Sequence, residues 1–181
     1  MWRDCARPLQ TEGTDAMKIH FFAFAALAAF STTAFGADVI RHKIPNSDFP
    51  VAQAVEIPAG QSLVFLSGAG ADIADKTAPK DSFAAYGDTK AQTLNTLTKI
   101  DATLKSMGLS MKDVVKMQVF LVGDPAQDGK MDFAGFMDSY KKFFGTAEQP
   151  NLPSRSAMKV AGLANPGWLV EIEVTAVRAA K

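Results

Sequence analysis

The stretch VVKMQVFLV, residues 114–122, decides the fold of this 181-residue chain. It is rich in β-branched and aliphatic side chains, and beyond Lys116 only Gln118 interrupts the apolar run. A run of this composition and length is typical of a strand that is buried on both faces in the middle of a sheet. Helical periodicity occurs on both sides of it along the chain, so we expect a central strand with helices packed over the sheet.

The segment before this strand, residues 88–107, has the periodicity of an amphipathic helix. Its apolar residues recur at intervals of three or four, which places them on one helical face. Asp88 is a suitable N-cap, and Gly108 can adopt the left-handed conformation that ends a helix. The apolar positions are Ala91, Leu94, Leu97, Ile100, Leu104 and Met107.

The segment after the strand, residues 133–144, predicts a second amphipathic helix that ends at Gly145. Its apolar face is mostly aromatic, which is more typical of a hydrophobic core than of a ligand-binding cluster. The residues on that face are Phe133, Phe136, Met137, Tyr140, Phe143 and Phe144.

Two strands are predicted before the first helix. Residues 51–57 and 63–66 surround the turn signal Pro58-Ala59-Gly60, and together they predict a hairpin. The glycines in Ser67-Gly68-Ala69-Gly70 lack the spacing of a phosphate-binding loop. This segment therefore predicts a turn that ends the second strand.

Residues 155–161 and 168–177, near the carboxyl end, predict two more strands. In the second of them Trp168, Val170, Ile172, Val174 and Ala176 alternate with Leu169, Glu171, Glu173 and Thr175. The order of elements is therefore ββαβαββ, an α+β fold with one sheet and two helices on one face. The opposite face combines apolar and charged residues, which predicts that it meets another subunit in a homo-oligomer.

Residues 17–36, MKIHFFAFAALAAFSTTAFG, have the build of a secretory signal peptide. Lys18 supplies the positive charge, residues 21–30 form the apolar core, and small residues before Ala37 favour cleavage there. The sequence therefore predicts a periplasmic or secreted protein with no membrane association after cleavage.

The chain is thus expected to consist of a precursor segment and one domain. Residues 1–16 show neither a signal nor a core pattern, and we interpret them as an extension upstream of the true start. The predicted boundaries are 1–36 for the precursor segment and 37–181 for the single domain.

Charge and residue content exclude several classes of function. Nineteen basic and nineteen acidic side chains give zero formal net charge, which argues against a dedicated nucleic-acid-binding protein. Cys5 lies in the precursor segment, and the domain keeps one histidine, His42, which we place on the surface of a first strand. Zinc sites built from Cys and His ligands and cysteine nucleophiles are therefore excluded. We expect no metal and no cofactor.

Several motifs, in register over roughly residues 48–178, resemble the Rid family of reactive intermediate deaminases, also called RidA or YjgF proteins. The four main ones are a helix start, two strand motifs and an arginine-containing segment. They read GDTKAQT at 87–93, DVVKMQVFL at 113–121, PSRSAMKV at 153–160 and VEIEV at 170–174, with further matches at 50–55 and 65–68.

The resemblance implies a chorismate-mutase-like fold, assembled as a homotrimer with ligand sites in the clefts between subunits. It also implies hydrolysis of reactive enamines and imines of α-amino acids to 2-oxo acids and ammonia. That reaction needs neither a metal nor a histidine, which agrees with the residue content of the domain.

The resemblance also assigns roles to individual residues. Arg155 is similar to the family's substrate-binding arginine, and a guanidinium can hold a carboxylate by two parallel hydrogen bonds. Glu171 is similar to the carboxylate that holds the attacking water, a general acid–base role. Ser67 would line the pocket, and the backbone around Ala157 would offer polar groups to the water or the ligand.

Two positions depart from the family pattern. Val51 stands where the family has a tyrosine and Met137 where it has an asparagine, and both changes make the expected pocket more apolar.

The leading hypothesis is an exported imine or enamine deaminase that uses Arg155 and Glu171. The alternative is a non-catalytic trimer that keeps the arginine for binding a carboxylate metabolite or a partner. Ribonuclease activity is a third hypothesis, against which the neutral charge and the lack of histidine argue.

Overall fold

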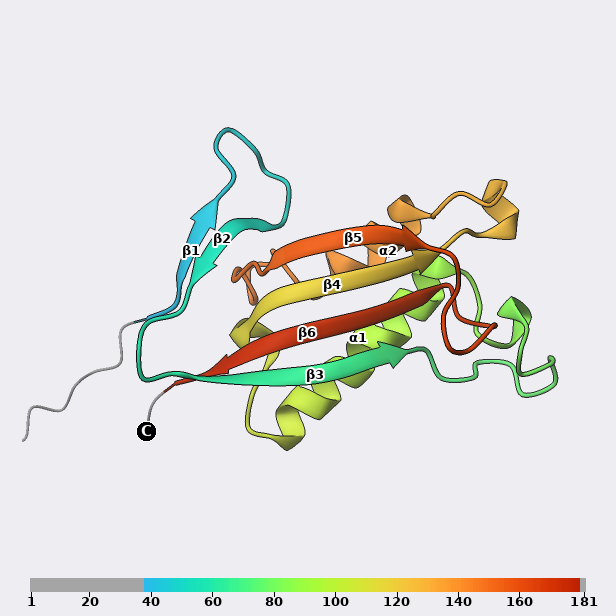
Figure 1. Cartoon of the computed structure of the whole chain (residues 1–181), viewed down its shortest axis with the longest axis horizontal. Helices are drawn as coiled ribbons and strands as arrows, with labels where there is room; N and C mark the ends of the chain where they lie inside the picture. Colours follow the sequence, from blue (N-terminus) through green and yellow to red (C-terminus); the bar gives the residue numbers. More distant parts are fainter. Residues whose placement is uncertain (1–37, 180–181) are drawn as a thin grey trace, which may run out of the picture. The chain divides into compact units, whose positions relative to one another are not determined.

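The computed structural model describes residues 38–179, and its strands form one six-stranded mixed sheet. Two α-helices, α1 and α2, lie behind the sheet in the view of Figure 1. This confirms the predicted α+β fold with two helices on one face. In spatial order the strands are β1 (Ile40–Lys43), β2 (Ala52–Glu56), β5 (Ser154–Val160), β4 (Val114–Val122), β6 (Val170–Arg178) and β3 (Ser62–Gly70), and the helices are α1 (Thr89–Ser106) and α2 (Phe133–Tyr140).

Strand β4 lies inside the sheet, parallel to β5 and antiparallel to β6. Its burial alternates along the strand. Met117, Val119 and Leu121 are fully buried under the helices, whereas Lys116 and Gln118 on the other face remain partly exposed. The predicted central position is confirmed, but within a single chain only the helix side is fully covered. We call the other side the open face of the sheet.

Helix α1 forms over the residues that the apolar periodicity predicts. At its start the predicted buried face is wrong, because Ala91 and Leu94 are exposed, and the buried positions are Gln92, Thr93 and Thr96. The Asp88 side chain accepts a hydrogen bond from the backbone N–H of Ala91 at 2.7 Å, which caps the first turn. Gly108 follows the helix with a φ of +70°, as a left-handed terminating residue requires. Leu97 and Leu104 are fully buried, and each contributes roughly 1.5–3 kcal/mol of hydrophobic stabilisation.

Helix α2 is shorter than predicted. It ends at Tyr140, and the backbone N–H groups of Phe143 and Phe144 both donate to the Tyr140 carbonyl in the turns that follow. The aromatic stripe packs as core, because Phe136, Tyr140 and Phe144 are almost completely buried. Gly145, with a φ of +77°, ends this turn region instead of the helix itself.

The predicted hairpin between residues 51–57 and 63–66 is wrong. Strand β2 pairs with β1, which the predicted order ββαβαββ omitted, and β3 pairs antiparallel with β6. Pairing with β6 places Val64 and Leu66 beside Ala176 and Val174 in the core. Strand β2 has little apolar surface to offer, because only Ala52 in it is buried.

The segment Ser67–Gly70 is a continuation of β3 and not a turn. The ladder to β6 shifts between Leu66, which faces Val174, and Ala69, which faces Ile172. Two residues of β3 therefore stand opposite one residue of β6, which is a β-bulge. Leu169, expected on the same face as Glu171, instead lies in the core just before β6 begins.

The predicted precursor segment, residues 1–36, lies outside the described residues. Within residues 38–179, no helix combines the length and the hydropathy that crossing a membrane requires.

His42 lies on β1, with an exposed side chain 2.6 Å from the Glu56 carboxylate, as expected for a surface position on a first strand.

Candidate functional site

Arg155 lies on the helix side of β5 and is surrounded by aromatic rings. It pairs with Met117 of β4, so both side chains point toward the helices. Among the described residues, four ring centroids lie within 6 Å of its Cζ atom. They belong to Tyr140 at 4.2 Å, Phe136 at 5.0 Å, Phe49 at 5.5 Å and Phe133 at 5.8 Å. We call these four residues the aromatic cage.

Spacing along α2 explains three of the four rings. Phe133, Phe136 and Tyr140 stand at intervals of three and four residues, and therefore share one face of the helix. The Tyr140 hydroxyl donates a hydrogen bond to the Pro50 carbonyl at 2.8 Å, which ties α2 to the loop before β2. Phe49 enters the cage from that loop.

The environment of Arg155 has an unbalanced charge. Its Nη1 atom is buried and has no hydrogen-bond partner among the described residues. Burial lowers the pKa of the guanidinium, an effect that the nearby Tyr140 partly opposes. Because an arginine remains protonated at neutral pH, the cage holds a cation with no carboxylate beside it in the described chain. A buried donor without a partner costs about 1–3 kcal/mol, and an anionic ligand would supply that partner.

The pKa of the Tyr140 hydroxyl is also shifted. Burial raises the pKa of its hydroxyl to about 12, although the charge of Arg155 acts in the opposite direction. The phenol is therefore neutral at physiological pH and serves as a hydrogen-bond donor to Pro50.

Glu171 lies on the open face, opposite to Arg155. It pairs with Phe120 of β4, and both side chains alternate with buried core positions such as Ile172. A Cβ atom at Gly68 would overlap the Glu171 carboxylate, so that carboxylate lies directly against the backbone of β3 at the bulge.

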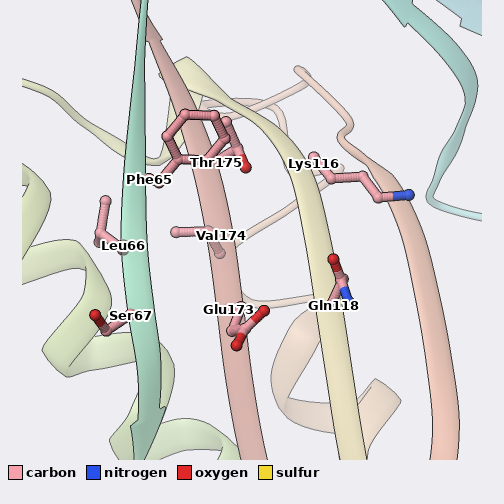
Figure 2. Close-up of a pocket in the computed structure, with 8 residues that line it drawn as sticks. All are labelled: Phe65, Leu66, Ser67, Lys116, Gln118, Glu173, Val174 and Thr175. Carbon is pink, nitrogen blue, oxygen red and sulfur yellow. The ribbon is translucent and has the colours of Figure 1, made fainter.

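The bulge of β3 also borders an open pocket of about 310 Å³ on the same face. Figure 2 shows Ser67 on β3, Glu173 on β6 and Gln118 on β4, and the last two are cross-strand partners. The other lining residues are Phe65, Leu66, Lys116, Val174 and Thr175. The open face thus combines carboxylates, an amide, a hydroxyl and a lysine with a highly exposed phenylalanine.

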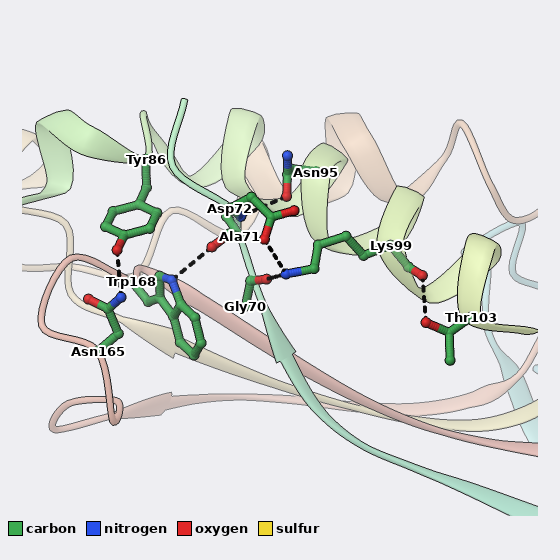
Figure 3. A network of polar contacts seen from close by, with 9 residues as sticks. All are labelled: Gly70, Ala71, Asp72, Tyr86, Asn95, Lys99, Thr103, Asn165 and Trp168. Carbon is green, nitrogen blue, oxygen red and sulfur yellow. Dashed lines mark hydrogen bonds and ion pairs between the residues drawn. The ribbon is translucent and has the colours of Figure 1, made fainter. Parts of the chain in front are cut away.

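Polar contacts fix the loop that leads into β6. The Trp168 ring lies against Gly70, leaving no space for a Cβ atom there, and its Nε1 donates to the Ala71 carbonyl at 3.0 Å (Figure 3). Asn165 donates to the Tyr86 hydroxyl at 2.6 Å in the same loop. Lys99 of α1 donates to the Gly70 carbonyl at 2.9 Å. These contacts hold the start of β6, and with it Glu171, against the end of β3.

Comparison with known proteins gives the family. The family model described as endoribonuclease L-PSP matches residues 44–178. A RutC family protein of Haemophilus influenzae is 34% identical over 136 residues, covering 75% of this chain and 92% of the relative. The chain belongs to the Rid (YjgF) family.

Two relatives within the Rid family bear on the fold and the site. TdcF of Escherichia coli, named as a candidate reactive intermediate deaminase, is 32% identical over 138 residues, covering 76% of this chain and 94% of its own. The structure of E. coli TdcF with bound serine has a TM-score of 0.51 at 30% identity, covering 79% and 99% of the two chains. A Rid protein of Yersinia pestis, 21% identical with a TM-score of 0.59 and coverage of 78% and 100%, shows the shared fold.

The predicted site residues of this Rid protein fall into two groups. Arg155 and Ala157 lie on the helix side of β5, and Met137 is buried on α2. Val51 follows Pro50, to which Tyr140 of the cage is bonded. In the second group, Glu171 lies on the open face, and Ser67 lies in the bulge of the edge strand β3, where it lines pockets on both faces of the sheet. One chain therefore does not bring the two groups together.

Sequence reasoning missed the aromatic cage. The aromatic stripe on α2 was visible in the sequence, but its spacing indicates a hydrophobic core. Phe136 and Tyr140 do lie in the core, and their rings also lie close to the Arg155 guanidinium. Phe49 gave no periodic signal because it lies in a loop. Its position directly before residues 50–55, a segment that resembles a family motif, was the available clue. Within the described residues, no group of three or more His, Cys, Asp or Glu side chains could hold a metal ion.

Proposed function

We propose that the protein is a hydrolytic deaminase that converts reactive imine or enamine intermediates of α-amino acids into 2-oxo acids and ammonia. The observation that carries this proposal is the buried Nη1 of Arg155, which lacks a partner inside a cage of aromatic rings. Such a group is suited to a small anion, because the cage excludes water and leaves the charge unneutralised. A carboxylate can accept two parallel hydrogen bonds from a guanidinium and is then fixed in orientation.

The relatives support this choice of ligand and chemistry. A related E. coli protein carries the name of a candidate reactive intermediate deaminase, and its structure contains bound serine, a small molecule with a carboxylate. All these relatives cover nearly their own full length in the comparison, so the whole domain is shared.

We infer that the active unit is a homotrimer with sites between subunits. Arg155 and Glu171 lie on opposite faces of one sheet, so a site that uses both must take each from a different chain. The open face also exposes Phe65, whose exposed fraction is 74%, and Leu63 at the free edge strand β3. Burying these side chains against a neighbouring chain would stabilise the assembly.

In the proposed reaction, Arg155 binds the substrate carboxylate and thereby positions the imine carbon. Glu171 of the neighbouring protomer orients a water molecule and accepts its proton as the water oxygen bonds to that carbon. That proton then passes to nitrogen, which gives a carbinolamine. The remaining hydroxyl proton also passes to nitrogen as the carbon–oxygen double bond forms and the carbon–nitrogen bond breaks, and the products are a 2-oxo acid and ammonia. Ser67 and the backbone around Ala157 would contribute polar contacts to the water and the ligand. No oxidant, metal or cofactor is needed to balance this hydrolysis.

A second candidate function is carboxylate binding without turnover. The apolar side chains of Val51 and Met137 favour it, since valine has no hydrogen-bonding group and the methionine sulfur is only a weak acceptor. A carboxylate that raises the melting temperature while remaining chemically unchanged would support this candidate over the enzyme.

The deciding experiment measures 2-oxo acid release from imines that an amino-acid oxidase generates in the assay. The wild-type protein is expected to accelerate release over buffer, and Arg155→Ala is expected to abolish the acceleration. Arg155→Lys should recover only part of it, because a lysine cannot form the two parallel hydrogen bonds. Arg178→Ala, which removes an arginine at the far end of β6, serves as the matched control. Absence of acceleration with the wild-type protein would refute the proposed activity.

We further propose that the protein acts outside the cytoplasm, on the basis of the signal-like segment 17–36. Expression of the full chain followed by fractionation and mass analysis tests this. A mature protein that begins at Ala37 in the periplasmic or secreted fraction is expected, and an uncleaved cytoplasmic chain would contradict it.

A further inference from the structure

Phe49 differs from the other rings of the aromatic cage in its exposure. Phe136 and Tyr140 are completely buried within the described residues. Phe49 has an exposed fraction of 43%, and its ring nevertheless lies 5.5 Å from the Arg155 Cζ atom. It is therefore the ring that stands between the guanidinium and solvent on the side of the β1–β2 loop.

The loop holds Phe49 in a defined position. Its backbone N–H donates to the Ser47 hydroxyl at 3.2 Å, and its carbonyl accepts from the N–H of Val51 at 2.8 Å. Pro50, between them, accepts the hydrogen bond from Tyr140. The backbone of Phe49 is thus hydrogen-bonded through both its N–H and its carbonyl group.

Phe49 also lines an open pocket of about 260 Å³, so the same residue borders both this pocket and the Arg155 guanidinium. Its polar members, Lys43, Ser47 and Asp48, are exposed and form the rim. The remaining members are mostly apolar: Ile44, Pro50, Val51, Gly145, Pro150 and Leu152. A side chain that extends from a carboxylate held at Arg155 would meet the Phe49 ring first and this pocket next.

We propose that Phe49 is a specificity-determining residue that selects 2-imino acids with branched or aromatic side chains over the methyl-bearing 2-iminopropanoate. This inference rests on the proposed function and names its substrate class. The physical reason is that the ring and the pocket remove apolar substrate surface from water, which a methyl group is too small to exploit.

The test compares imines generated from alanine, leucine and phenylalanine, with kcat/KM measured for each. One extra methylene group in an apolar pocket changes kcat/KM by about 10–200-fold. The kcat/KM for the leucine-derived imine should therefore exceed that for the alanine-derived imine by at least about tenfold. Phe49→Ala should reduce this ratio to about threefold or less by lowering kcat/KM for the larger imines. Leu94→Ala, which removes an exposed apolar side chain on α1, is the matched control and should leave the ratio unchanged.

A second variant tests the same proposal in case Phe49→Ala does not fold. Ile44→Trp fills the pocket without altering Phe49, and it should lower kcat/KM for the leucine- and phenylalanine-derived imines while sparing the alanine-derived one. Melting temperatures identify any variant that is merely unstable. A wild-type protein that hydrolyses all three imines equally well would overturn the specificity proposal and leave the proposed function standing. Hydrolysis of none of them would overturn the proposed function itself.

Discussion

The Glu171 carboxylate lies against the backbone of Gly68, in the space that a Cβ atom at position 68 would occupy. The two residues belong to neighbouring strands, and the bulge in β3 brings them together. A side chain at position 68 would collide with the flexible end of Glu171, which can move away at little cost. Position 68 therefore allows the carboxylate to be displaced without disturbing the core.

The first prediction uses this contact. Gly68→Ala should reduce kcat for imine hydrolysis by about 10²-fold, because the displaced carboxylate no longer orients the water. The free energy of unfolding should change by less than about 1 kcal/mol, since the clash involves only a mobile side chain. Steady-state kinetics and denaturant unfolding measure the two effects.

Gly162→Ala is the control for this prediction, because a Cβ atom there meets nothing within 4 Å. It should behave as the wild type in both assays. An unaltered kcat in Gly68→Ala would mean that the position of the Glu171 carboxylate does not matter to the reaction.

The second prediction concerns pH and Tyr140. The pKa of this hydroxyl is about 12 in the folded protein, compared with 10.0 for an unperturbed tyrosine. Because the folded state holds its proton to higher pH, stability from this group is fully present below pH 10 and is lost as the pH rises toward 12. The full shift corresponds to about 2–3 kcal/mol. Denaturant unfolding at pH 8 and pH 11 should show this loss.

Lysine side chains also titrate in this alkaline range. Tyr140→Phe removes the tyrosine hydroxyl, so a comparison with the wild type isolates the contribution of Tyr140 to the pH dependence of stability. At pH 8 the variant should be less stable by about 1 kcal/mol, because Pro50 loses its hydrogen bond. Its stability should then fall less between pH 8 and pH 11 than that of the wild type. Parallel pH profiles of the two proteins would contradict the assigned pKa.

The third prediction concerns Gln92, a fully buried amide on α1. Its Nε2 donates to the carbonyls of Gly87 and Gly167, and its Oε1 accepts from the Leu169 N–H at 2.8 Å. Gln92→Leu keeps the volume but leaves these backbone groups without partners, and should lower the free energy of unfolding by about 3 kcal/mol or more. Thr98→Ala, on the exposed side of α1, should cost little. A stable Gln92→Leu protein would show that the loop before β6 is held by its other contacts alone.

The sequence allowed the helices and the central strand to be predicted, because their signals are local. The spacing of Leu97 and Leu104 and the N-cap at Asp88 are properties of one segment, and the structure confirms them. Strand pairing was not predictable in the same way. Gly60 marks a turn, with a φ of +88°, but a turn does not determine which strands lie next to each other. The pairing of β3 with β6 depends on core contacts between segments about a hundred residues apart.

The candidate site was predictable as a set of residues but not as an arrangement. Arg155 and Glu171 were identified by resemblance to a family, and one-dimensional motifs carry no information on which face of a sheet each side chain takes. The register of β5 and β6 against β4 places them on opposite faces. The role of Phe49 depends on its distance from Arg155, which is a property of the folded chain alone.

The last prediction follows from the position of Arg155 and Glu171 on opposite faces of the sheet. If each site takes Arg155 from one protomer and Glu171 from the next, then Arg155→Ala and Glu171→Gln proteins are each inactive alone. When the two are unfolded together and refolded at equal concentrations, every mixed trimer contains one site with both native residues. Random assembly then restores about a quarter of the wild-type activity, because about three-quarters of the trimers are mixed and each has one intact site in three. Refolding each variant separately before mixing provides the control and should restore nothing. Recovery of no activity in the co-refolded sample, with trimers confirmed by light scattering, would rule out a site shared between subunits.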